Sequence, residues 1–546
     1  MNETGAPLPE AAVPPVRPLL RWAAWIVIVA VYVGLRAPLL EIPLDRDEGV
    51  FSYIALGVLR GEVPYREAKD YKPPGVFYML ALGLAFVPPT AAGIHFWLHL
   101  WNFGSLLLLA SSAKALYGER AGLWTGFVYA FLSASVAVQG YTASTEMFLL
   151  LPLAASLRLT IAGATRTGRS SLVCLAAGGA CAALACWTKQ PALFSLLAVP
   201  IWLLFNGARP GIRAAFLRLG WWLAGGVVLS ILIVAYFTYH LGLREFLYWA
   251  FPVKLYGTRW SYWWDTLWWT LKEAIWDHLP VLVLGAFGFL VRAFLRGKDL
   301  WFPIALFLLG IPAVFTGPIF YRHYFAVLTA SIALFGGVGL GTVQEWHWIL
   351  RDRTRAIEFT LVAGAICLSG ALYAPRPYAN VAGWTTKAHE KAAEALREAA
   401  HPGDGALLMI GRSQIAVMAD LRLPSMFPMY ESLNSDPERT QEFQLAAIAR
   451  LRDNPPRFLI HSPGGDEHTC PFPPKFFQHY VENLRDHQYE PWRYIVVDPH
   501  QDPSLPNRMK KYLSLTPETF QSYQPPLTPV YVIRIPKARM PAEGGP

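Results

Sequence analysis

The stretch LDRDEGVFSYIALGVLRGEVPYREAKDYKPPGVFY, residues 44–78, follows directly on the first long apolar run of the chain. It begins with a dense charge cluster, Asp45-Arg46-Asp47-Glu48, and ends with a lysine set before two prolines, Lys72-Pro73-Pro74. A charged segment that follows an apolar run of membrane-spanning length is expected at a membrane surface. The stretch therefore predicts a membrane protein whose first loop carries chemically active side chains.

The composition supports a membrane protein. The chain has 546 residues, of which 54% are hydrophobic and only 16% are charged, whereas about a quarter of the residues in soluble domains are charged. Several apolar runs reach the roughly 20 residues that span the hydrocarbon of a bilayer. The net charge of +9 is accounted for by Lys and Arg in cytoplasmic loops. We therefore expect a lipid bilayer as partner and no nucleic acid.

The apolar runs predict about 11 transmembrane helices in a domain covering residues 19–375. Residues 1–18, rich in Pro and Ala, are expected to form a disordered cytoplasmic N-terminus. Outer loops are expected at 41–91 and 241–277. The expected spans lie near residues 19–40, 92–113, 121–139, 145–160, 172–187, 190–206, 217–240, 278–296, 300–316, 324–342 and 357–374.

The orientation of the spans is predicted from the positions of the basic residues. With the N-terminus inside, every inner connection between spans contains basic residues, in agreement with the positive-inside rule. The apolar run 75–89 is short, and counting it as a span would move the later arginines outside. We therefore interpret it as an interfacial or re-entrant helix of the first outer loop. An odd number of spans then places the C-terminal segment outside.

Two further regions have a distinct composition. Residues 241–277 are rich in Trp and Tyr, which is typical of an aromatic belt that anchors a protein at the interface. The alternative is a flexible lid that stacks on a sugar or packs on a lipid tail. In residues 380–546, helical patterns at 385–400 and 438–453 alternate with short apolar strands. This alternation predicts an extracytoplasmic α/β domain.

The acidic cluster of the first loop contains one carboxylate that local structure does not explain. Asp45 and Glu48 have the spacing of a capping box before the helical pattern FSYIALGVL. Asp47 has no part in such a cap. A carboxylate beside Arg46 at a membrane interface is a candidate general base. We therefore interpret Asp47 as the catalytic base, Glu48 as a second candidate catalytic acid, and Asp45 and Arg46 as supporting residues.

Three outer connections offer cationic or hydrogen-bonding side chains. Lys72 precedes two prolines, which favour a helix start, and free N–H groups at a helix N-terminus attract anions. Lys189-Gln190-Pro191 repeats this arrangement, and Tyr321-Arg322-His323-Tyr324 forms the third connection. We expect Lys72, Lys189, Arg322 and His323 to bind a phosphate, with Tyr324 as a supporting residue. The alternative is a general attraction to anionic lipid headgroups, with the lysines snorkelling toward them.

A further acidic residue follows the third expected span. In Tyr141-Thr142-Ala143-Ser144-Thr145-Glu146, Ser144 or Thr145 can cap the next helix, and Glu146 would lie in its first turn. Glu146 then either compensates the helix dipole or is a further candidate catalytic residue, which orients a donor or acceptor sugar or binds a metal. The histidines are scattered and form no convincing metal cluster, so a divalent metal ion is a candidate cofactor without an assigned site.

Residues 41–206 and 300–340 resemble bacterial relatives of protein O-mannosyltransferases and the lipid A aminoarabinose transferases, which are membrane glycosyltransferases of the GT-C fold class. The matching features are Asp47-Glu48, Glu146, Lys72-Pro73-Pro74 and Arg322-His323-Tyr324. The resemblance implies an enzyme of the inner or plasma membrane that moves a sugar from a polyprenyl-phosphate donor. The acceptor would be a hydroxyl of a glycolipid, a cell-envelope glycan or a protein at the outer face.

The resemblance also implies roles for the residues. Asp47 would accept the proton of the acceptor in a single inverting displacement. Lys72, Lys189 and either Arg322 or His323 would neutralise the leaving phosphate. Two other classes are alternatives: a lipid-linked glycan transporter or flippase, and a non-catalytic envelope assembly protein. A transporter should carry charges along an internal pathway, and an assembly protein would not need acids and lysines gathered at one depth.

Overall fold

The computed structural model describes residues 15–207, 211–251, 260–296, 301–316, 320–349, 353–373, 387–428, 433, 436, 438–463, 475–501, 504, 510–523 and 526–537. The chain divides into two compact units. The helical unit comprises Met1–Leu39, Leu98–Ile233 and Thr258–Tyr378, and the loop–sheet unit comprises Leu40–Trp97, Val234–Gly257 and Ala379–Pro546. Most of the expected disordered N-terminus, residues 1–18, lies outside the described residues.

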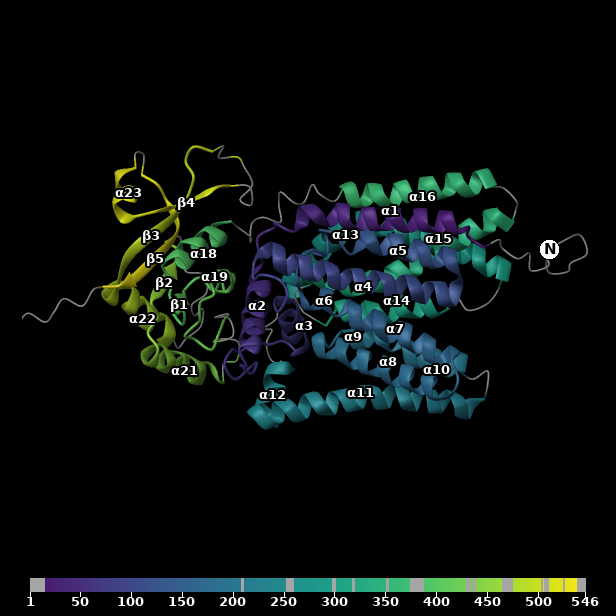
Figure 1. Cartoon of the computed structure of the whole chain (residues 1–546), viewed down its shortest axis with the longest axis horizontal. Helices are drawn as coiled ribbons and strands as arrows, with labels where there is room; N and C mark the ends of the chain where they lie inside the picture. The colour runs from purple at the N-terminus through teal and green to yellow at the C-terminus, as the bar shows by residue number, and fades with distance from the viewer. Residues whose placement is uncertain are drawn as a thin grey trace, which may run out of the picture. The chain divides into compact units, whose positions relative to one another are not determined.

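The helices of the helical unit run alongside one another (Figure 1). Each expected span overlaps one or more of them. They are α1 (Pro18–Arg36), η1 (Ala37–Leu39), α4 (Ala91–Tyr117), α5 (Glu119–Leu132), α6 (Thr145–Phe148), α7 (Leu150–Thr165), α8 (Gly168–Thr188), α9 (Ala192–Leu196), α10 (Ala198–Gly207), α11 (Ile212–Leu241), α13 (Trp260–Arg296), α14 (Trp301–Val314), η2 (Arg322–Leu328), α15 (Thr329–Ile349) and α16 (Arg353–Tyr373). Two of the boundaries between the units fall inside helices, in α4 and in α11.

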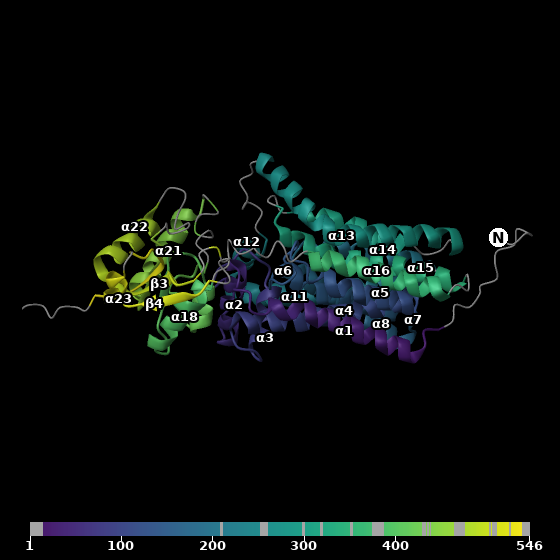
Figure 2. The same ribbon diagram turned by 90° about the horizontal axis from the view of Figure 1, so that it is seen from above.

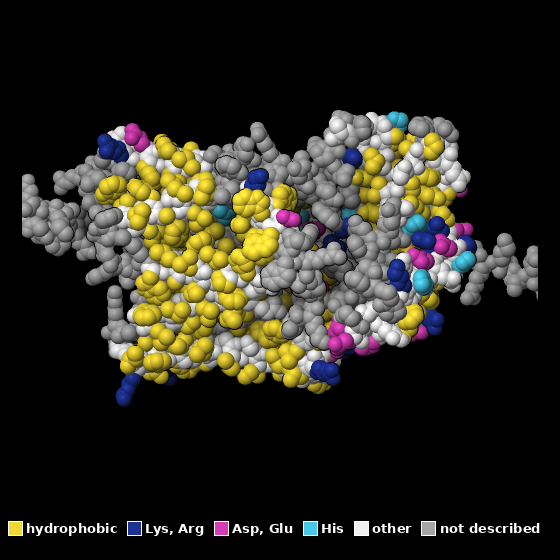
Figure 3. Space-filling model, turned by 180° about the vertical axis from the view of Figure 1, so that it is seen from behind, with side chains coloured by type: hydrophobic (Ala, Val, Ile, Leu, Met, Phe, Trp, Pro, Cys, Tyr) yellow, Lys and Arg dark blue, Asp and Glu magenta, His cyan; other side chains and the backbone are white. Residues whose placement is uncertain are grey.

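Helix length and hydrophobicity identify the chain as a membrane protein. Within the described ranges, 5 segments are long and apolar enough to cross a bilayer: Pro18–Leu39, Thr145–Thr165, Gly168–Thr188, Ile212–Leu241 and Arg322–Trp346. The face of the helical unit in Figure 3 is covered mainly by hydrophobic side chains. Exposed apolar surface of this extent is stable in lipid and not in water. The count of about 11 spans and their direction remain predictions.

Small residues bring α8 and α11 together. A Cβ atom added at Gly179 would overlap the carbonyl of Trp222, and one added at Gly225 would overlap the carbonyl of Ala176. In lipid there is little hydrophobic driving force between helices, so close backbone approach of this kind supplies much of the packing energy. Both contacts lie inside the helical unit.

The loop–sheet unit combines the first loop, the end of α11 and the C-terminal region. Its helical pattern at 46–59 forms a helix as expected, and the run 75–89 contains a helix of 10 residues, about 15 Å long, which is too short to span a bilayer. Its helices are α2 (Arg46–Leu59), α3 (Gly75–Leu84), α12 (Leu243–Ala250), α18 (Ala388–Ala399), α19 (Gln414–Ala419), α21 (Thr440–Asp453), α22 (Phe476–Asn483), the π-helical turn η3 (Leu484–Gln488) and α23 (Pro517–Ser522).

A five-stranded mixed sheet forms the core of the C-terminal region. The strands are β1 (Ala406–Leu408), β2 (Phe458–His461), β3 (Tyr489–Val497), β4 (Tyr512–Leu515) and β5 (Pro529–Pro536), in the order β1-β2-β5-β3-β4. Only β1 and β2 pair in parallel. Figure 2 shows α21 and α22 on one side of the sheet and α18 on the other. The predicted C-terminal sheet is therefore present, whereas its extracytoplasmic location is still a prediction.

Contacts within the loop–sheet unit join α2 to the C-terminal region. A Cβ atom added at Gly49 would lie 2.5 Å from the backbone nitrogen of Gln414, so α2 and α19 approach closely. The hydroxyl of Tyr53 accepts a hydrogen bond from the backbone N–H of Leu423 at 2.9 Å. The C-terminal sheet region and the charged first loop are thus parts of one compact unit.

A third segment, α12, is tied to the same unit by a carboxylate. Glu245 lies 3.3 Å from Lys69 Nζ through one oxygen and 3.0 Å from the Arg439 guanidinium through the other. The indole N–H of Trp249 donates to Glu245 at 2.7 Å. Much of the expected second outer loop, 241–277, is helical, in α12 and the start of α13, while residues 252–259 lie outside the described residues.

Candidate functional site

The N-terminus of α2 carries the acidic cluster, and its local structure is the predicted capping box. The backbone N–H of Asp45 donates to Glu48 Oε2 at 2.7 Å. The other oxygen of Glu48 lies 3.0 Å from His95 Nε2, and both side chains are buried. Both carboxylate oxygens of Glu48 therefore have partners inside the loop–sheet unit. This arrangement gives Glu48 a structural role, and its predicted catalytic role is untested.

Asp47 is the more accessible carboxylate of this helix turn. Its Oδ1 atom lies 4.0 Å from Arg46 Nε, and the two side chains are 29% and 31% exposed, respectively. The pKa of neighbouring Asp45 is raised to about 6 by burial, followed by the charges of Asp47 and Glu48. A carboxylate that is half-buried and reachable from solvent is placed to exchange a proton with a bound hydroxyl.

Lys72 lies where the proline pattern predicts, just before a helix. Pro74 caps α3, which begins at Gly75. The backbone carbonyl of Lys72 accepts a hydrogen bond from the Tyr65 hydroxyl at 2.6 Å. Tyr65 is fully buried and has a φ of 69°, a conformation that is rare for a non-glycine residue and that persists when the surrounding contacts enforce it. The backbone of Lys72 is thereby fixed, and its side chain is half-buried.

In the helical unit, Lys189 and Glu146 form a buried ion pair. Lys189 Nζ lies 2.9 Å from Glu146 Oε1, and the side chains are 16% and 3% exposed. Lys189 ends α8, and Pro191 caps the following helix α9. The sequence pattern of a lysine before a proline and a helix start therefore has the same local structure at residues 72 and 189.

His323 joins this ion pair from η2. Its Nε2 atom lies 4.0 Å from Glu146 Oε1. Its Nδ1 atom lies 3.0 Å from the side-chain oxygen of Gln139, so with this amide orientation Nδ1 carries the proton and donates. Gln139 has a φ of 52°, a strained conformation of the kind that clusters at functional sites. The hydrogen bond to Gln139 sets which ring nitrogen is presented to Glu146.

Further side chains surround the same carboxylate. The hydroxyl of Thr145 donates to Glu146 Oε2 at 2.7 Å. Lys189 Nζ lies 5.0 Å from the ring centroid of Tyr324, which is within the range of a cation–π contact. Tyr324 thus contacts Lys189, which is expected to bind phosphate, and the supporting role of Tyr324 stays a prediction. We call Glu146, Lys189, His323 and Tyr324 the helical cluster.

Arg322 occupies a different environment from its neighbour His323. Its guanidinium carbon lies 4.0 Å from the ring centroid of Trp269, on α13. The guanidinium therefore stacks on an indole, which fixes the orientation of its plane.

The structure groups the predicted site residues by unit. The helical cluster and Arg322 belong to the helical unit, whereas residues 45–48 and Lys72 belong to the loop–sheet unit. A single site containing both groups therefore remains a prediction.

Several partners of the candidate site residues could not be predicted from the sequence. Gln139 contacts His323, and Trp269 contacts Arg322. His95 contacts Glu48. None of these three partners belongs to a local sequence motif. Each contacts a residue that is distant in the sequence, and such a contact leaves no pattern among neighbouring residues. Thr145 was visible next to Glu146 in the polar run, although only as a helix cap.

The described residues contain no metal-binding site, since no group of three or more His, Cys, Asp or Glu side chains among them is arranged to hold a metal ion. The residues therefore assign no position to the candidate divalent ion.

No family model matches the chain, and no curated protein matches its sequence. Solved structures are similar in fold. The lipid A aminoarabinose transferase ArnT from Cupriavidus metallidurans, bound to undecaprenyl phosphate, matches with a TM-score of 0.55 and 15% identity over 87% of this chain and 96% of that protein. The oligosaccharyltransferase from Archaeoglobus fulgidus matches with a TM-score of 0.51 and 12% identity over 95% of this chain and 77% of that protein.

Both proteins are of the GT-C class. Similarity at this level of identity concerns the fold, and it extends over both the helical unit and the loop–sheet unit. The resemblance expected from Asp47-Glu48, Glu146 and Lys72-Pro73-Pro74 is confirmed at that level. This chain has the fold of GT-C membrane glycosyltransferases.

Proposed function

We propose that this protein is an inverting glycosyltransferase that moves a sugar from a polyprenyl-phosphate donor to an acceptor hydroxyl at the outer face of the membrane. The acceptor is a glycolipid, a cell-envelope glycan or a protein. The observation that carries the proposal is the helical cluster, in which Lys189 and His323 converge on buried Glu146 within a GT-C fold. The similar ArnT structure holds undecaprenyl phosphate, which is the kind of lipid phosphate that the proposed donor releases when its sugar is transferred.

The chemistry is a single displacement. The acceptor oxygen attacks the anomeric carbon, and its proton passes to the carboxylate of Asp47. The bond between the anomeric carbon and the phosphate oxygen breaks, and its electron pair stays on the phosphate. Lys72, Lys189 and Arg322 or His323 stabilise the negative charge that develops there.

Glu146 has a positioning role in this proposal. Its carboxylate is 2.9 Å from Lys189 Nζ and 4.0 Å from His323 Nε2, so it holds the ammonium group and the imidazole ring on one side of the cluster before the donor lipid binds. Oriented charges of this kind need no rearrangement as the phosphate leaves. Glu146 can also orient a sugar hydroxyl once Lys189 turns to the phosphate.

The proposed topology follows from the proposed chemistry. The protein lies in the inner or plasma membrane with a cytoplasmic N-terminus, about 11 spans and the loop–sheet unit on the outer side. Labelling of single cysteines introduced at Glu67 and Glu394 with an impermeant reagent tests this topology. Labelling from the outside of intact cells is expected, and labelling only after the membrane is opened would contradict the proposal.

A transfer assay tests the activity. Purified protein is mixed with a polyprenyl-phosphate sugar and an acceptor, and the wild type is compared with Asp47→Asn. The loss of a general base is expected to lower the rate about 10²- to 10⁴-fold. The control is Asp453→Asn, an exposed acid of α21, which should keep wild-type activity. Full transfer by Asp47→Asn would show that Asp47 is not the base.

A further inference from the structure

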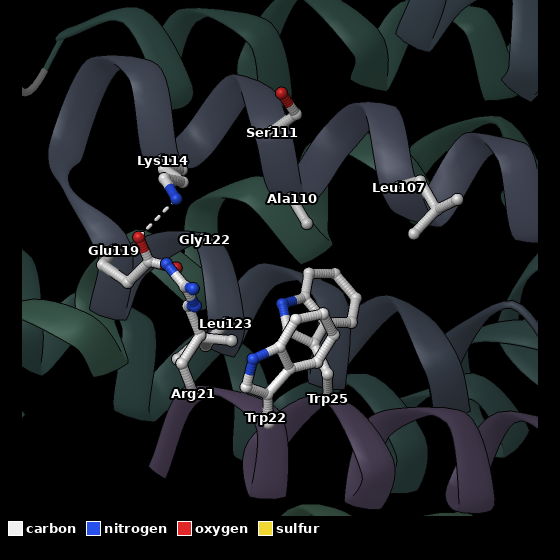
Figure 4. A pocket seen from close by; sticks show the side chains of 10 residues that line it. All are labelled: Arg21, Trp22, Trp25, Leu107, Ala110, Ser111, Lys114, Glu119, Gly122 and Leu123. Atoms are coloured by element: carbon white, nitrogen blue, oxygen red, sulfur yellow. Dashed lines mark ion pairs between the residues drawn. The ribbon is translucent and has the colours of Figure 1, made fainter. Parts of the chain in front are cut away.

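A cavity of about 240 Å³ opens between α1, α4 and α5 of the helical unit (Figure 4). It has an apolar part and a charged part. Its lining includes the charged residues Arg21, Lys114 and Glu119 and the apolar residues Trp22, Trp25 and Leu107.

The apolar part of the cavity adjoins exposed apolar side chains of α1 and α4. In Figure 4 the indole rings of Trp22 and Trp25 lie next to each other and project toward α4. Trp22 is 63% exposed and Leu107 is 43% exposed. Tryptophan is enriched at the depth of lipid headgroups. An acyl chain in this part of the cavity would therefore contact the apolar side chains of Leu107 and Trp22.

The charged part carries one net positive charge, because it contains two cations, Arg21 and Lys114, and one carboxylate, Glu119. Lys114 Nζ lies 2.5 Å from a Glu119 oxygen, and the Arg21 side chain extends toward the same carboxylate in Figure 4. Lys114 is the more exposed member of its pair, with 52% of its side chain accessible. A phosphate that enters between Arg21 and Lys114 would accept hydrogen bonds from the guanidinium and from the ammonium group.

The cavity is at the opposite end of the helices from the helical cluster. Glu119, which lines the cavity, is the first residue of α5. This helix runs for 14 residues, or about 20 Å, to Leu132, and the chain then continues to Gln139 at the helical cluster. A separation of about 20 Å along α5, compared with a bilayer core of about 30 Å, places the two sites at different depths of the membrane.

We propose that this cavity binds one anionic phospholipid, with the phosphate between Arg21 and Lys114 and an acyl chain along Trp25 and Leu107. Cations and aromatic rings at one depth beside an apolar groove match the three parts of such a lipid. The site is separate from the proposed donor site and does not depend on the proposed transferase activity.

The test measures lipid binding to full-length, delipidated protein in detergent by native mass spectrometry. Phosphatidylglycerol and phosphatidylcholine are titrated separately. The wild type should bind one phosphatidylglycerol more tightly than phosphatidylcholine. Arg21→Gln and Lys114→Gln should each weaken phosphatidylglycerol binding about fivefold, because one basic residue near a membrane surface contributes a factor of this size. Glu119→Gln should strengthen it by a similar factor.

A matched control separates this cavity from the general charge of the protein. Arg169 and Arg213 are exposed residues of the helical unit outside the cavity, and Arg169→Gln with Arg213→Gln should leave binding within twofold of the wild type. Equal binding of both lipids, equal weakening by the control, or no effect of Glu119→Gln would each overturn the proposal. Binding of inorganic phosphate as tight as that of the lipid would also overturn it. If the Arg21 or Lys114 variant fails to fold, Glu119→Gln decides the result.

Discussion

Each of the two groups of candidate site residues contains an ion pair between a carboxylate and a basic side chain, but one pair is buried and the other is partly exposed. In the helical unit, Glu146 and Lys189 are 2.9 Å apart, and the carboxylate is 3% exposed. In the loop–sheet unit, Asp47 and Arg46 are 4.0 Å apart and both about 30% exposed. A buried charge depends strongly on its partner, whereas a surface pair contributes little to stability. The buried pair is thus suited to hold fixed charge, and the accessible carboxylate is suited to exchange a proton.

The largest expected effect comes from breaking the buried pair. Lys189→Met leaves Glu146 buried without its cation, which should lower the free energy of unfolding by about 3–5 kcal/mol. The measurement is thermal denaturation of the purified protein in detergent.

Adding Glu146→Gln to Lys189→Met should recover most of the lost stability, because the unpaired charge is then removed. A double variant as unstable as Lys189→Met would show that Lys189 stabilises the fold by other contacts.

The next effect concerns the close approach of α2 to α19. Gly49→Ala places a methyl group 2.5 Å from the backbone nitrogen of Gln414, and the resulting shift should cost about 1–3 kcal/mol. Thermal denaturation measures the loss, and the transfer rate should fall with it if this contact positions Asp47.

Gly34→Ala is the matched control. Its added Cβ meets no atom within 4 Å, so the variant should be at least as stable as the wild type, since alanine favours a helix over glycine. Equal stability of the Gly49 variant would show that α2 and α19 can separate without cost.

A pH effect is expected in the loop–sheet unit, which holds a buried neutral histidine. Burial, followed by the charge of Arg412, lowers the pKa of His389 to about 3. The unfolded chain therefore binds a proton on this residue below about pH 6.5 that the folded chain does not bind. Stability should fall as the pH decreases from 6.5 toward 3, by up to about 1.4 kcal/mol for each pH unit.

Thermal denaturation at pH 7.5 and at pH 5.5 checks this effect. His389→Asn should reduce the difference between the two melting temperatures, and His401→Asn, at an exposed position, should leave it unchanged. His461, whose pKa is lowered to about 4 by burial and then by Arg534, should account for part of the dependence that remains. A pH dependence that is unaltered in His389→Asn would contradict the assignment.

The smallest effect on stability is expected at the accessible pair. Asp47→Asn and Arg46→Gln should each change the free energy of unfolding by less than about 1 kcal/mol, because the pair is long and partly exposed. The comparison is sharpest for Asp47→Asn, which should combine a large loss of transfer with an almost unchanged melting temperature. A large loss of stability in Asp47→Asn would show that the exposed Asp47–Arg46 pair contributes to stability as much as the buried Glu146–Lys189 pair does.

Local patterns in the sequence determined much of the architecture. The apolar runs predicted helices that the structure contains, and the alternation at 385–535 predicted the helices and strands of the C-terminal sheet. The Asp45 and Glu48 spacing predicted the capping box, and the prolines after Lys72 and Lys189 predicted the helix starts. These features depend on residues within a few positions of one another, so periodicity and turn chemistry are sufficient to find them.

Only the tertiary structure decided which distant side chains meet. Glu146 meets His323 across 177 residues, and Glu48 meets His95 in a buried pair. The first loop, α12 and the C-terminal sheet form one compact unit through Gly49 and Glu245. A single polar residue that pairs across the fold has no periodic signal, because its partner is chosen by the packing of whole helices. The sequence therefore determined the membrane class, the local elements and the candidate residues, and the packing determined their partners.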